Sequence, residues 1–301
     1  MANLKEKIFS KKHWIFDIII GLLLIIIIIL IDILIMRFKS APGEFKGLFL
    51  KEEEPLLLEN GNIPIQKISA GEKVFIPILN FHHIDKAPLN LSKINKSFYV
   101  EPEKFEAILN DLIKNDYQPV FVSEIAKYLA ADELPQEKIM AITFDDGNED
   151  FYSQAWPILQ KLKIKSNMYV MTGVRGKNWV TPEQIVELDK SGLVEIGSHT
   201  VWHPYLTRIS KIEQSRELKD SKEFLDKLLN KNINVICYPF GLFNQRVEEL
   251  AQEVGYKAGL TFDQDAWQKS DDLMELKRIS VYPGLEVIKF LDKLRNEGIG
   301  Y

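Results

Sequence analysis

Two adjacent carboxylates follow an apolar run in "KIMAITFDDG", where Asp145 and Asp146 stand between Phe144 and Gly147. Neighbouring side chains on a strand point to opposite faces, so both carboxylates can serve one site only where the strand ends and the chain turns. Glycine permits such a turn. The pair can therefore offer a carboxylate to a metal ion. The alternative interpretation is that both aspartates cap the following helix.

The histidines are few and unevenly placed. The chain has 5 of them, and all except His13 follow strand-like runs. His82 and His83 end "VFIPILNFHH", while His199 and His203 lie four residues apart in "SHTVWHP". That spacing lets two imidazoles reach one metal ion from a helical turn or compact loop. An isolated pair of this kind is often a coincidence, but the nearby aspartates favour a metal site.

Alternating strand-like and helix-like segments from residue 74 onward must position these side chains. Repeated units of this length predict parallel strands covered by helices, as an open doubly wound sheet or a barrel. Chemistry in both architectures collects at the carboxyl ends of the strands, which is where the polar residues above fall. Strands are predicted at residues 74–81, 118–122, 138–144, 166–172, 194–199, 234–240, 258–262 and 278–282, and helices at 101–116, 123–130, 152–163, 181–192, 211–230, 245–255 and 286–294.

An apolar segment precedes this domain. Residues 14–36, "WIFDIIIGLLLIIIIILIDILIM", would form a helix of roughly 34 Å, enough to span a bilayer. Four lysines before it predict a cytoplasmic N-terminus at residues 1–13 and a catalytic domain outside the cell. A cleaved signal peptide is the alternative. Residues 37–73 are interpreted as a linker or stalk, and residues 74–301 as the catalytic domain.

Composition excludes several other classes. The net charge of −5 argues against a nucleic-acid partner, because no face is basic enough to neutralise a phosphate backbone. Cys237 is the single cysteine, which rules out an internal disulfide and a cysteine-based zinc site.

The motifs "TFDDG" and "SHTVWHP", in this order, resemble the NodB-homology polysaccharide deacetylases, carbohydrate esterase family four. The resemblance covers residues 74–294. It implies a distorted (β/α) barrel that removes acetyl groups from N-acetylated sugars with one divalent metal ion. By position, Asp146, His199 and His203 would bind the metal and Asp145 would be the general base. Such ligands suit Zn²⁺, with Co²⁺, Ni²⁺ and Fe²⁺ as alternatives.

The remaining motifs of the family match less closely. "CYPFG" implies that the backbone N–H of Phe240 stabilises the oxyanion, but Cys237 stands where many members have an arginine that bridges to the base. The resemblance thus leaves Asp145 without that partner. The late histidine that usually serves as general acid is absent too. Phe81 and His82 instead match an early motif of the circularly permuted poly-N-acetylglucosamine deacetylases, which implies His82 as the acid, with His83 as the alternative. Barrel closure would make the first and last strands neighbours.

These features lead to three functional hypotheses. The first is a membrane-anchored, extracellular hydrolase that removes N-acetyl groups from a poly-β-1,6-N-acetylglucosamine-type polysaccharide of biofilms, with a synthase or export proteins as possible partners. The second is a different enzyme of the same family, either a peptidoglycan or chitooligosaccharide N-deacetylase or, after it, an O-acetyl esterase acting on xylan. The third is a non-catalytic glycan-binding protein with a degenerate site, favoured by Cys237. Aromatic residues expected near the cleft are Trp202, Tyr205, Phe243 and Trp267, and Asp263 or Asp265 could orient a catalytic group.

Overall fold

The structure, a computed structural model, describes residues 65–297. The predicted cytoplasmic segment 1–13, the predicted transmembrane segment 14–36 and most of the predicted stalk lie outside the described residues. Within residues 65–297, no helix combines the length and the apolar character needed to cross a membrane.

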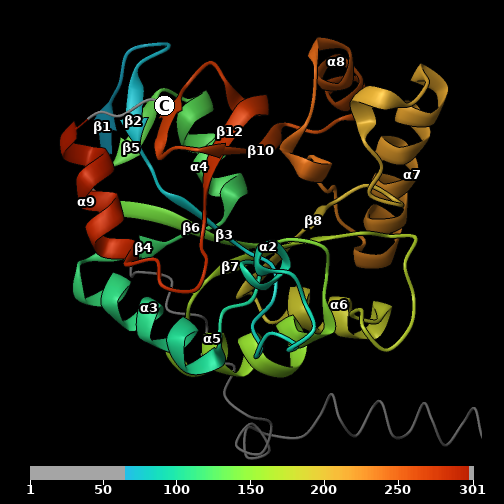
Figure 1. Cartoon of the computed structure of the whole chain (residues 1–301). Coiled ribbons are helices and arrows are strands. Elements are labelled where there is room, and N and C mark those ends of the chain that lie inside the picture. Colours follow the sequence, from blue (N-terminus) through green and yellow to red (C-terminus); the bar gives the residue numbers. More distant parts are fainter. Residues whose placement is uncertain (1–64, 298–301) are drawn as a thin grey trace, which may run out of the picture. The chain divides into compact units, whose positions relative to one another are not determined.

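Seven parallel strands close into a barrel (Figure 1). Going round the barrel, β3 lies beside β12, followed by β10, β9, β8, β7 and β6, and β6 pairs with β3 to close the ring. A further strand, β4, pairs with the first residues of β6 but is not part of the closed ring. The barrel confirms the predicted fold class and excludes the open sheet. The bounds are β3 (Ile78–Phe81), β4 (Tyr117–Pro119), β6 (Lys138–Phe144), β7 (Ser166–Val170), β8 (Val194–Ser198), β9 (Val235–Cys237), β10 (Ala258–Gln264) and β12 (Leu276–Ser280).

Amphipathic helices surround the strands (Figure 1). The helix predicted at residues 101–116 buries Phe105, Ile108, Leu109 and Leu112 on the predicted face. At residues 181–192 the predicted capping box is present, because the Thr181 hydroxyl accepts a hydrogen bond from the Gln184 N–H and the Gln184 side chain accepts one from the Thr181 N–H. These helices are α3 (Pro102–Lys114), α5 (Trp156–Leu162, continuing the π-helical turn Phe151–Ala155), α6 (Pro182–Lys190), α7 (Lys211–Leu229), α8 (Gln245–Val254) and α9 (Val287–Glu297).

The alternation of side chains along β6 separates two cores. Met140 and Phe144 pack in the cluster under the surrounding helices, whereas Ile139 and Ala141 belong to a second cluster with interior residues of the other strands. Helix α4 (Val122–Ala130) contributes its buried apolar side chains to that second cluster. The barrel interior is therefore closed at the end where α4 packs.

Five short elements lie outside the barrel and its large helices. Of these, β2 overlaps the start of the strand predicted at residues 74–81, and the other four were not predicted. The antiparallel pairs are β1 (Ile65–Lys67) with β5 (Glu133–Pro135) and β2 (Lys73–Phe75) with β11 (Trp267–Lys269), and α2 (Lys93–Lys96) is a single helical turn. Residues 65–73 fall within the predicted stalk, whose boundary stays a prediction.

Several predicted strands are shorter than expected, among them the strand predicted at residues 234–240, of which only Val235–Cys237 forms β9. The strand predicted at residues 74–81 is broken, because the Ile76 N–H bonds to Ala266 while Pro77 has no N–H to donate. The strand predicted at residues 118–122 ends at Pro119, since α4 already begins at Val122, where the Glu124 carboxylate accepts the N–H of Phe121.

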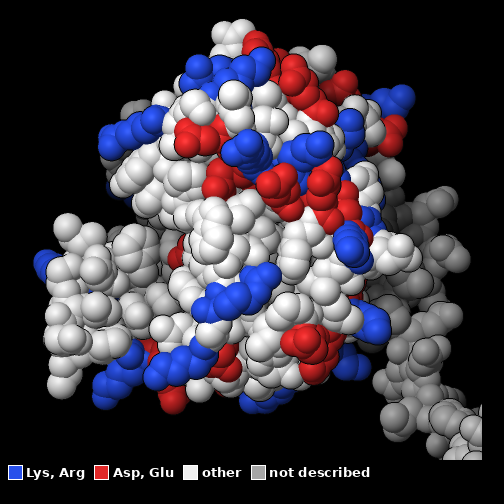
Figure 2. All heavy atoms as spheres, turned by 90° about the vertical axis from the view of Figure 1, so that its right-hand side faces the viewer, with Lys and Arg blue, Asp and Glu red and all other residues white. Residues whose placement is uncertain are grey.

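The face that carries α7 and α8 is strongly but evenly charged. Figure 2 shows basic and acidic side chains intermixed on this face. Along α7, Lys219 lies 3.6 Å from Glu223, and both of these side chains are exposed. This pattern confirms the interpretation of α7 as a solvated helix.

Candidate functional site

The backbone turn after β6 explains how both aspartates reach one cavity. Asp145 is the next inward-facing residue after Ala141 and Thr143 and is almost completely buried. Asp146 and Gly147 then adopt positive φ values of 73° and 78°, and the Gly147 N–H bonds back to the Asp145 carbonyl at 3.0 Å. The chain thus leaves the strand at Asp146, and both carboxylates line the same space.

Asp146, His199 and His203 form a candidate metal site. Asp146 Oδ1 lies 3.5 Å from His199 Nε2 and 3.9 Å from His203 Nε2, and the three ligand atoms lie within 4.8 Å of one another. His199 Nδ1 contacts the Cys237 carbonyl at 2.8 Å, which leaves Nε2 for the metal. One carboxylate and two imidazoles, which would leave further coordination positions open, fit a divalent transition metal. This ligand set does not identify the metal.

The loop that carries the histidines is held by side chains from its surroundings. His203 and Thr200 have positive φ values of 56° and 64°, which are costly for residues other than glycine. The Thr200 hydroxyl accepts the His203 N–H, and the Glu217 carboxylate of α7 accepts the N–H groups of Val201 and Trp202. These contacts keep the strained loop in the ligand-binding conformation.

Arg278 on β12 supplies the guanidinium that the sequence motif lacks. Its Nη1 and Nη2 atoms contact Asp145 Oδ1 and Oδ2 at 2.7 and 2.8 Å, and Nη2 lies 3.2 Å from Cys237 Sγ. The expectation that Asp145 has no arginine partner is therefore wrong, and with it goes the argument for a degenerate site. The sequence feature that could have indicated this partner is the single arginine in the otherwise largely apolar strand "RISVY".

Electrostatics favour the protonation states that the chemistry needs at Asp145 and His203. Burial alone would raise the pKa of Asp145, but the Arg278 guanidinium outweighs it and holds the pKa of this carboxyl well below its usual range. Burial and the neighbouring His199 lower the pKa of His203 to about 4. At neutral pH, Asp145 is thus an ionised carboxylate, and His203 is a neutral imidazole able to bind a metal ion. Burial alone would lower the pKa of His199, but Cys237 and Asp146 raise it well above its ordinary value, so a metal ion has to displace a proton from its Nε2.

His82 lines the same cavity as the candidate metal ligands. Because β3 is between β12 and β6, His82 Nε2 comes within 3.9 Å of Asp145 Oδ2. Its ring packs against Phe98 and Phe262, with centroid distances of 4.6 and 6.0 Å. Burial lowers the pKa of His82, against the opposing effect of the two aspartates, so its protonated ring is a stronger acid than a free imidazole.

His83 points to a different partner. Its Nδ1 lies 2.6 Å from Asp150 Oδ2, and its ring stacks on Tyr99. Of the two histidines at this strand end, only His82 lies within 4 Å of Asp145 among the described ion pairs. The assignment of His82 as general acid stays a prediction, but the geometry supports it over His83.

The candidate site residues share one cavity of about 460 Å³. Its size suits a sugar unit, since ligand pockets are typically about 300–1,000 Å³. The segment between β3 and α3 contributes one wall and Phe262 another. The cavity is lined by His82, His83, Asp145, Asp146, His199, His203 and Phe240, together with Leu91, Asn95, Phe98, Tyr99 and Phe262.

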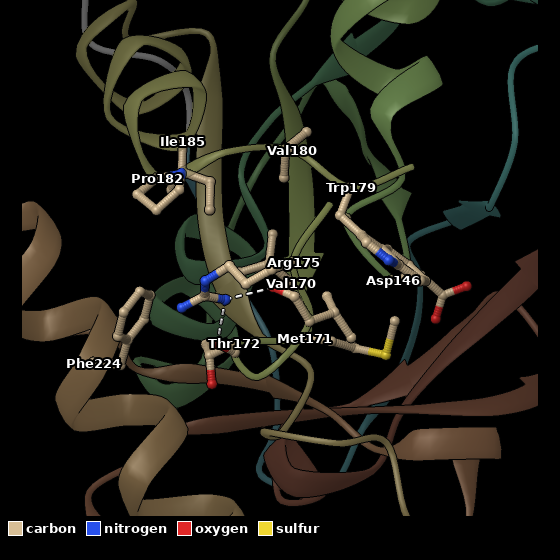
Figure 3. Close-up of a pocket in the computed structure, with 12 residues that line it drawn as sticks. Asp146, Val170, Met171, Thr172, Arg175, Trp179, Val180, Pro182, Ile185 and Phe224 are labelled. Carbon is tan, nitrogen blue, oxygen red and sulfur yellow. Dashed lines mark hydrogen bonds between the residues drawn. The ribbon is translucent and has the colours of Figure 1, made fainter. Parts of the chain in front are cut away.

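A much smaller cavity lies behind Asp146 (Figure 3). Its volume of about 10 Å³ leaves room for one water molecule at most. Arg175 lines it, but its guanidinium donates to the carbonyls of Thr172 and Val174 and packs over the Phe224 ring. Figure 3 shows the Asp146 carboxylate directed away from Arg175. Ligand binding is therefore assigned to the larger cavity.

Phe240 has the backbone geometry of a tight turn beside the histidine loop. Its φ is 60°, its ring centroid lies 4.4 Å from that of His203, and it stacks on Tyr205 at 4.0 Å. The role of its N–H as an oxyanion donor stays a prediction. Trp202 is 64% exposed with its ring against Gly173, and neither Trp202 nor Tyr205 lines the cavity.

Four other residues expected at the cleft or beside a catalytic group do not line the cavity. Phe243 stacks on Tyr238, and the Trp267 indole donates to the Leu294 carbonyl. The Asp265 carboxylate bonds to backbone N–H groups of its own turn and to Lys277. Neither Asp263 nor Asp265 lines the cavity with His82. Phe243 lies in the connection between β9 and α8, and the other three residues lie on β10, on β11 or between them. The sequence did not reveal the direction of these side chains.

Comparisons with known proteins place this arrangement in a family. The family profile described as "Polysaccharide deacetylase" matches residues 132–259. YxkH of Bacillus subtilis strain 168, a protein assigned to the polysaccharide deacetylases, is 32% identical over 211 residues, which are 70% of this chain and 72% of YxkH. A poly-beta-1,6-N-acetyl-D-glucosamine N-deacetylase of Staphylococcus aureus strain MSSA476 is 27% identical over 228 residues, covering 67% of this chain and 77% of that protein. The solved structure of Streptococcus pyogenes deacetylase PplD in complex with acetate is 32% identical with a TM-score of 0.66, covering 73% of this chain and 98% of PplD.

Proposed function

Because this chain belongs to the polysaccharide deacetylase family and is thus a deacetylase of the hydrolase class, we propose that it removes N-acetyl groups from a poly-β-1,6-N-acetylglucosamine-type polysaccharide with the help of one divalent metal ion. The observation that carries the proposal is the cavity in which an arginine-paired carboxylate, an Asp-His-His cluster and a separate histidine converge. The similarity to the staphylococcal enzyme and the early position of His82 support the choice of polymer.

Asp146, His199 and His203 would hold the metal ion, for which Zn²⁺ is the best match to one carboxylate and two imidazoles. A bound cation supplies Lewis acidity, which polarises the acetamide carbonyl and makes a water molecule more acidic. His199 is fixed for this role by its contact with the Cys237 carbonyl.

Asp145 is the proposed general base. Its carboxylate stays ionised because both oxygens bond to Arg278, and it can accept a proton from the water molecule as the water oxygen attacks the acetamide carbon. The Phe240 N–H is proposed to donate to the carbonyl oxygen as negative charge develops on it.

His82 is the proposed general acid. When the carbon–nitrogen bond breaks, the leaving nitrogen needs a proton, and His82 lines the same cavity as the Asp-His-His cluster, with Nε2 3.9 Å from Asp145 Oδ2. Donation from the His82 imidazolium yields the free amine, and the water oxygen leaves in acetate. Phe98 and Phe262 hold the ring in place and exclude water from it.

We further propose that residues 14–36 anchor the protein in the cell membrane with the catalytic domain outside. The apolar run and the lysines before it support this orientation. Such an anchor would keep the domain close to a polymer leaving the cell through synthase or export proteins. Protease treatment of intact cells that express the full-length chain should degrade the domain, and its protection until the cells are lysed would contradict the orientation.

Acetate release from a β-1,6-linked N-acetylglucosamine oligomer tests the proposed activity. We expect the full-length chain to release acetate with Zn²⁺, to stop after chelation and to recover when Zn²⁺ is added back. Chitooligosaccharides and peptidoglycan serve as competing substrates in parallel reactions. Release from peptidoglycan or chitooligosaccharides alone would overturn the proposed polymer.

A further inference from the structure

His83 lines the active-site cavity, but the proposed chemistry does not use it. Asp150 Oδ2 lies 2.6 Å from its Nδ1, and Asp150 Oδ1 accepts the Ile84 N–H at 3.2 Å. The ring lies flat on Tyr99, with an interplanar angle of 7° and a centroid distance of 4.1 Å. A carboxylate on Nδ1 selects the form that carries hydrogen there, so both the orientation and the tautomer of the ring are fixed.

The backbone of His83 anchors the segment that forms one wall of the cavity. Its N–H donates to the Phe98 carbonyl at 3.0 Å, and its carbonyl accepts the Val100 N–H at 2.9 Å. The loop closed by these two bonds contains Leu91, Asn95 and Phe98, all of which line the cavity. His83 therefore lies at the fixed base of this wall.

One polar atom of the ring has no hydrogen-bond partner. Among residues 65–297, no hydrogen bond involves His83 Nε2, and the side chain is 24% exposed. A sugar presents hydroxyl groups next to apolar C–H faces, and sites that bind sugars need a directed polar atom beside an aromatic surface. Nε2 of His83 and the ring of Tyr99 form such a combination.

We infer that His83, oriented by Asp150 and stacked on Tyr99, binds a hydroxyl group of the sugar unit whose acetamide lies at the Asp-His-His cluster. The inference rests on the proposed function, because it takes an N-acetylated sugar as the ligand of this cavity. His83 is thus a substrate-binding residue, distinct from the proton donor His82 on the same strand end.

Equilibrium binding separates this role from catalysis. The Asp145→Asn chain, full length and loaded with Zn²⁺, is titrated with a β-1,6-linked N-acetylglucosamine pentamer and, separately, with N-acetylglucosamine. His83→Asn is then added, because the asparagine amide can occupy the position of Nδ1 and keep the bond to Asp150 but has no atom at the position of Nε2. We expect about a tenfold loss of affinity for both ligands, as for one hydrogen bond to a partly buried group. Leu89→Ala, on the same segment but 91% exposed and outside the cavity lining, should leave both affinities unchanged.

Hydrogen exchange of residues 84–99 completes the test. Unchanged exchange together with weaker binding supports direct contact with the sugar. Equal affinities with and without His83→Asn would overturn the inference, as would weaker binding accompanied by faster exchange, since His83 would then only hold the wall. If the pentamer does not bind but the monosaccharide does, the proposed polymer is wrong, and the monosaccharide affinities still decide the role of His83.

Discussion

Asp145 combines two demands on one carboxylate. Both of its oxygens contact Arg278, and the two side chains are 3% and 1% exposed, so the pair is shielded from water. A carboxylate with a lowered pKa is a weak base. Arg278 therefore keeps Asp145 ionised and oriented. In the proposed mechanism, the metal ion held by Asp146, His199 and His203 would have to make the water acidic enough for proton transfer.

Replacement of the base should abolish turnover without loss of the metal site. Asp145→Asn keeps the size of the side chain but removes the proton acceptor, for which we expect kcat to fall by about 10²–10⁴-fold. Zn²⁺ affinity, measured by competition with a chromophoric chelator, should stay within a few-fold of the parent because Asp146, His199 and His203 are unchanged. Full activity of Asp145→Asn would show that the base is another group.

Removal of Arg278 should affect both stability and activity. Arg278→Met leaves the Asp145 carboxylate buried and unpaired, a change that typically costs about 3–5 kcal/mol. We expect a lower unfolding midpoint in denaturant and loss of acetate release. Cys237→Ala removes the sulfur atom that lies 3.2 Å from Arg278 Nη2 but leaves the Arg278–Asp145 pair in place. This variant is the matched control and should retain most of the activity.

An arginine at position 237 on β9 tests whether it can replace Arg278 on β12 as the partner of Asp145. Cys237 Sγ lies 3.5 Å from Asp145 Oδ1, close to where an arginine from β9 would enter. If a guanidinium is required but its strand of origin is not, Cys237→Arg should recover part of the activity lost in Arg278→Met. If the Arg278→Met single variant is as active as the parent, the ion pair between Arg278 and Asp145 is not needed for catalysis.

At the scale of elements, the closed end of the barrel contains a partly buried acid. Glu195 on β8 accepts hydrogen bonds from the Ser123 N–H at 3.2 Å and from the Ser123 hydroxyl, and thereby caps α4. Burial raises the pKa of Glu195 despite these bonds. The folded state consequently binds this proton more tightly than the unfolded state, so stability falls as pH rises from about 4.5 through the folded-state pKa.

Glu195→Gln should remove this pH dependence. The glutamine oxygen can still accept the Ser123 N–H, and the side chain carries no charge to bury. We expect the variant to be more stable than the parent at pH 7 and the difference to shrink as pH falls towards 4. Denaturant unfolding at several pH values measures this, and a constant difference across the range would contradict it. Glu187→Gln, an acid on α6 whose carboxylate contacts the exposed Tyr152 hydroxyl, is a surface control.

Elements with a strong pattern were predictable from the sequence. The apolar run that precedes the aspartates forms β6 with the predicted bounds 138–144, and the capping signature at Thr181 starts α6. Strands of three residues such as β1 and β11 carry too short a pattern to be recognised, and their pairing depends on segments far away in the chain. Phe243 and Trp267 were misplaced because sequence spacing does not show which way a loop side chain points.

Site residues that lie close together in the sequence were predicted, whereas a partner from a distant strand was missed. Asp145, Asp146, His199 and His203 belong to two compact motifs, and the structure brings them together with His82. Arg278 lies 133 residues from Asp145 on a strand that carries no motif, so its contact with Asp145 could be seen only once the order of strands round the barrel was known.

At the scale of the whole molecule, barrel closure assembles the site. The parallel pairs β12–β3 and β3–β6 put Arg278, His82 and Asp145 on three adjacent strands, although these residues come from the end, beginning and middle of the described chain. This confirms the expectation that the first and last strands of the barrel are neighbours. A histidine after the first barrel strand can thus occupy the position that a histidine after the last strand would occupy in a circularly permuted chain. The arrangement of the site in space stays the same.

Metal binding should stabilise the whole domain, because the ligands come from β6 and from the loop after β8 and lie together only in the folded state. A ligand present at 100 times its dissociation constant contributes about 2.7 kcal/mol, which for a domain of this size corresponds to about 5–10 °C in Tm. We expect the Tm of the full-length chain to fall by this amount on chelation and to return with Zn²⁺. Asp145→Asn should show the same shift and Asp146→Ala almost none, since only Asp146 is a proposed ligand. A shift that persists in Asp146→Ala would place the ion elsewhere, for example among Asp145, His199 and Cys237, whose ligand atoms also lie within 4.8 Å of one another.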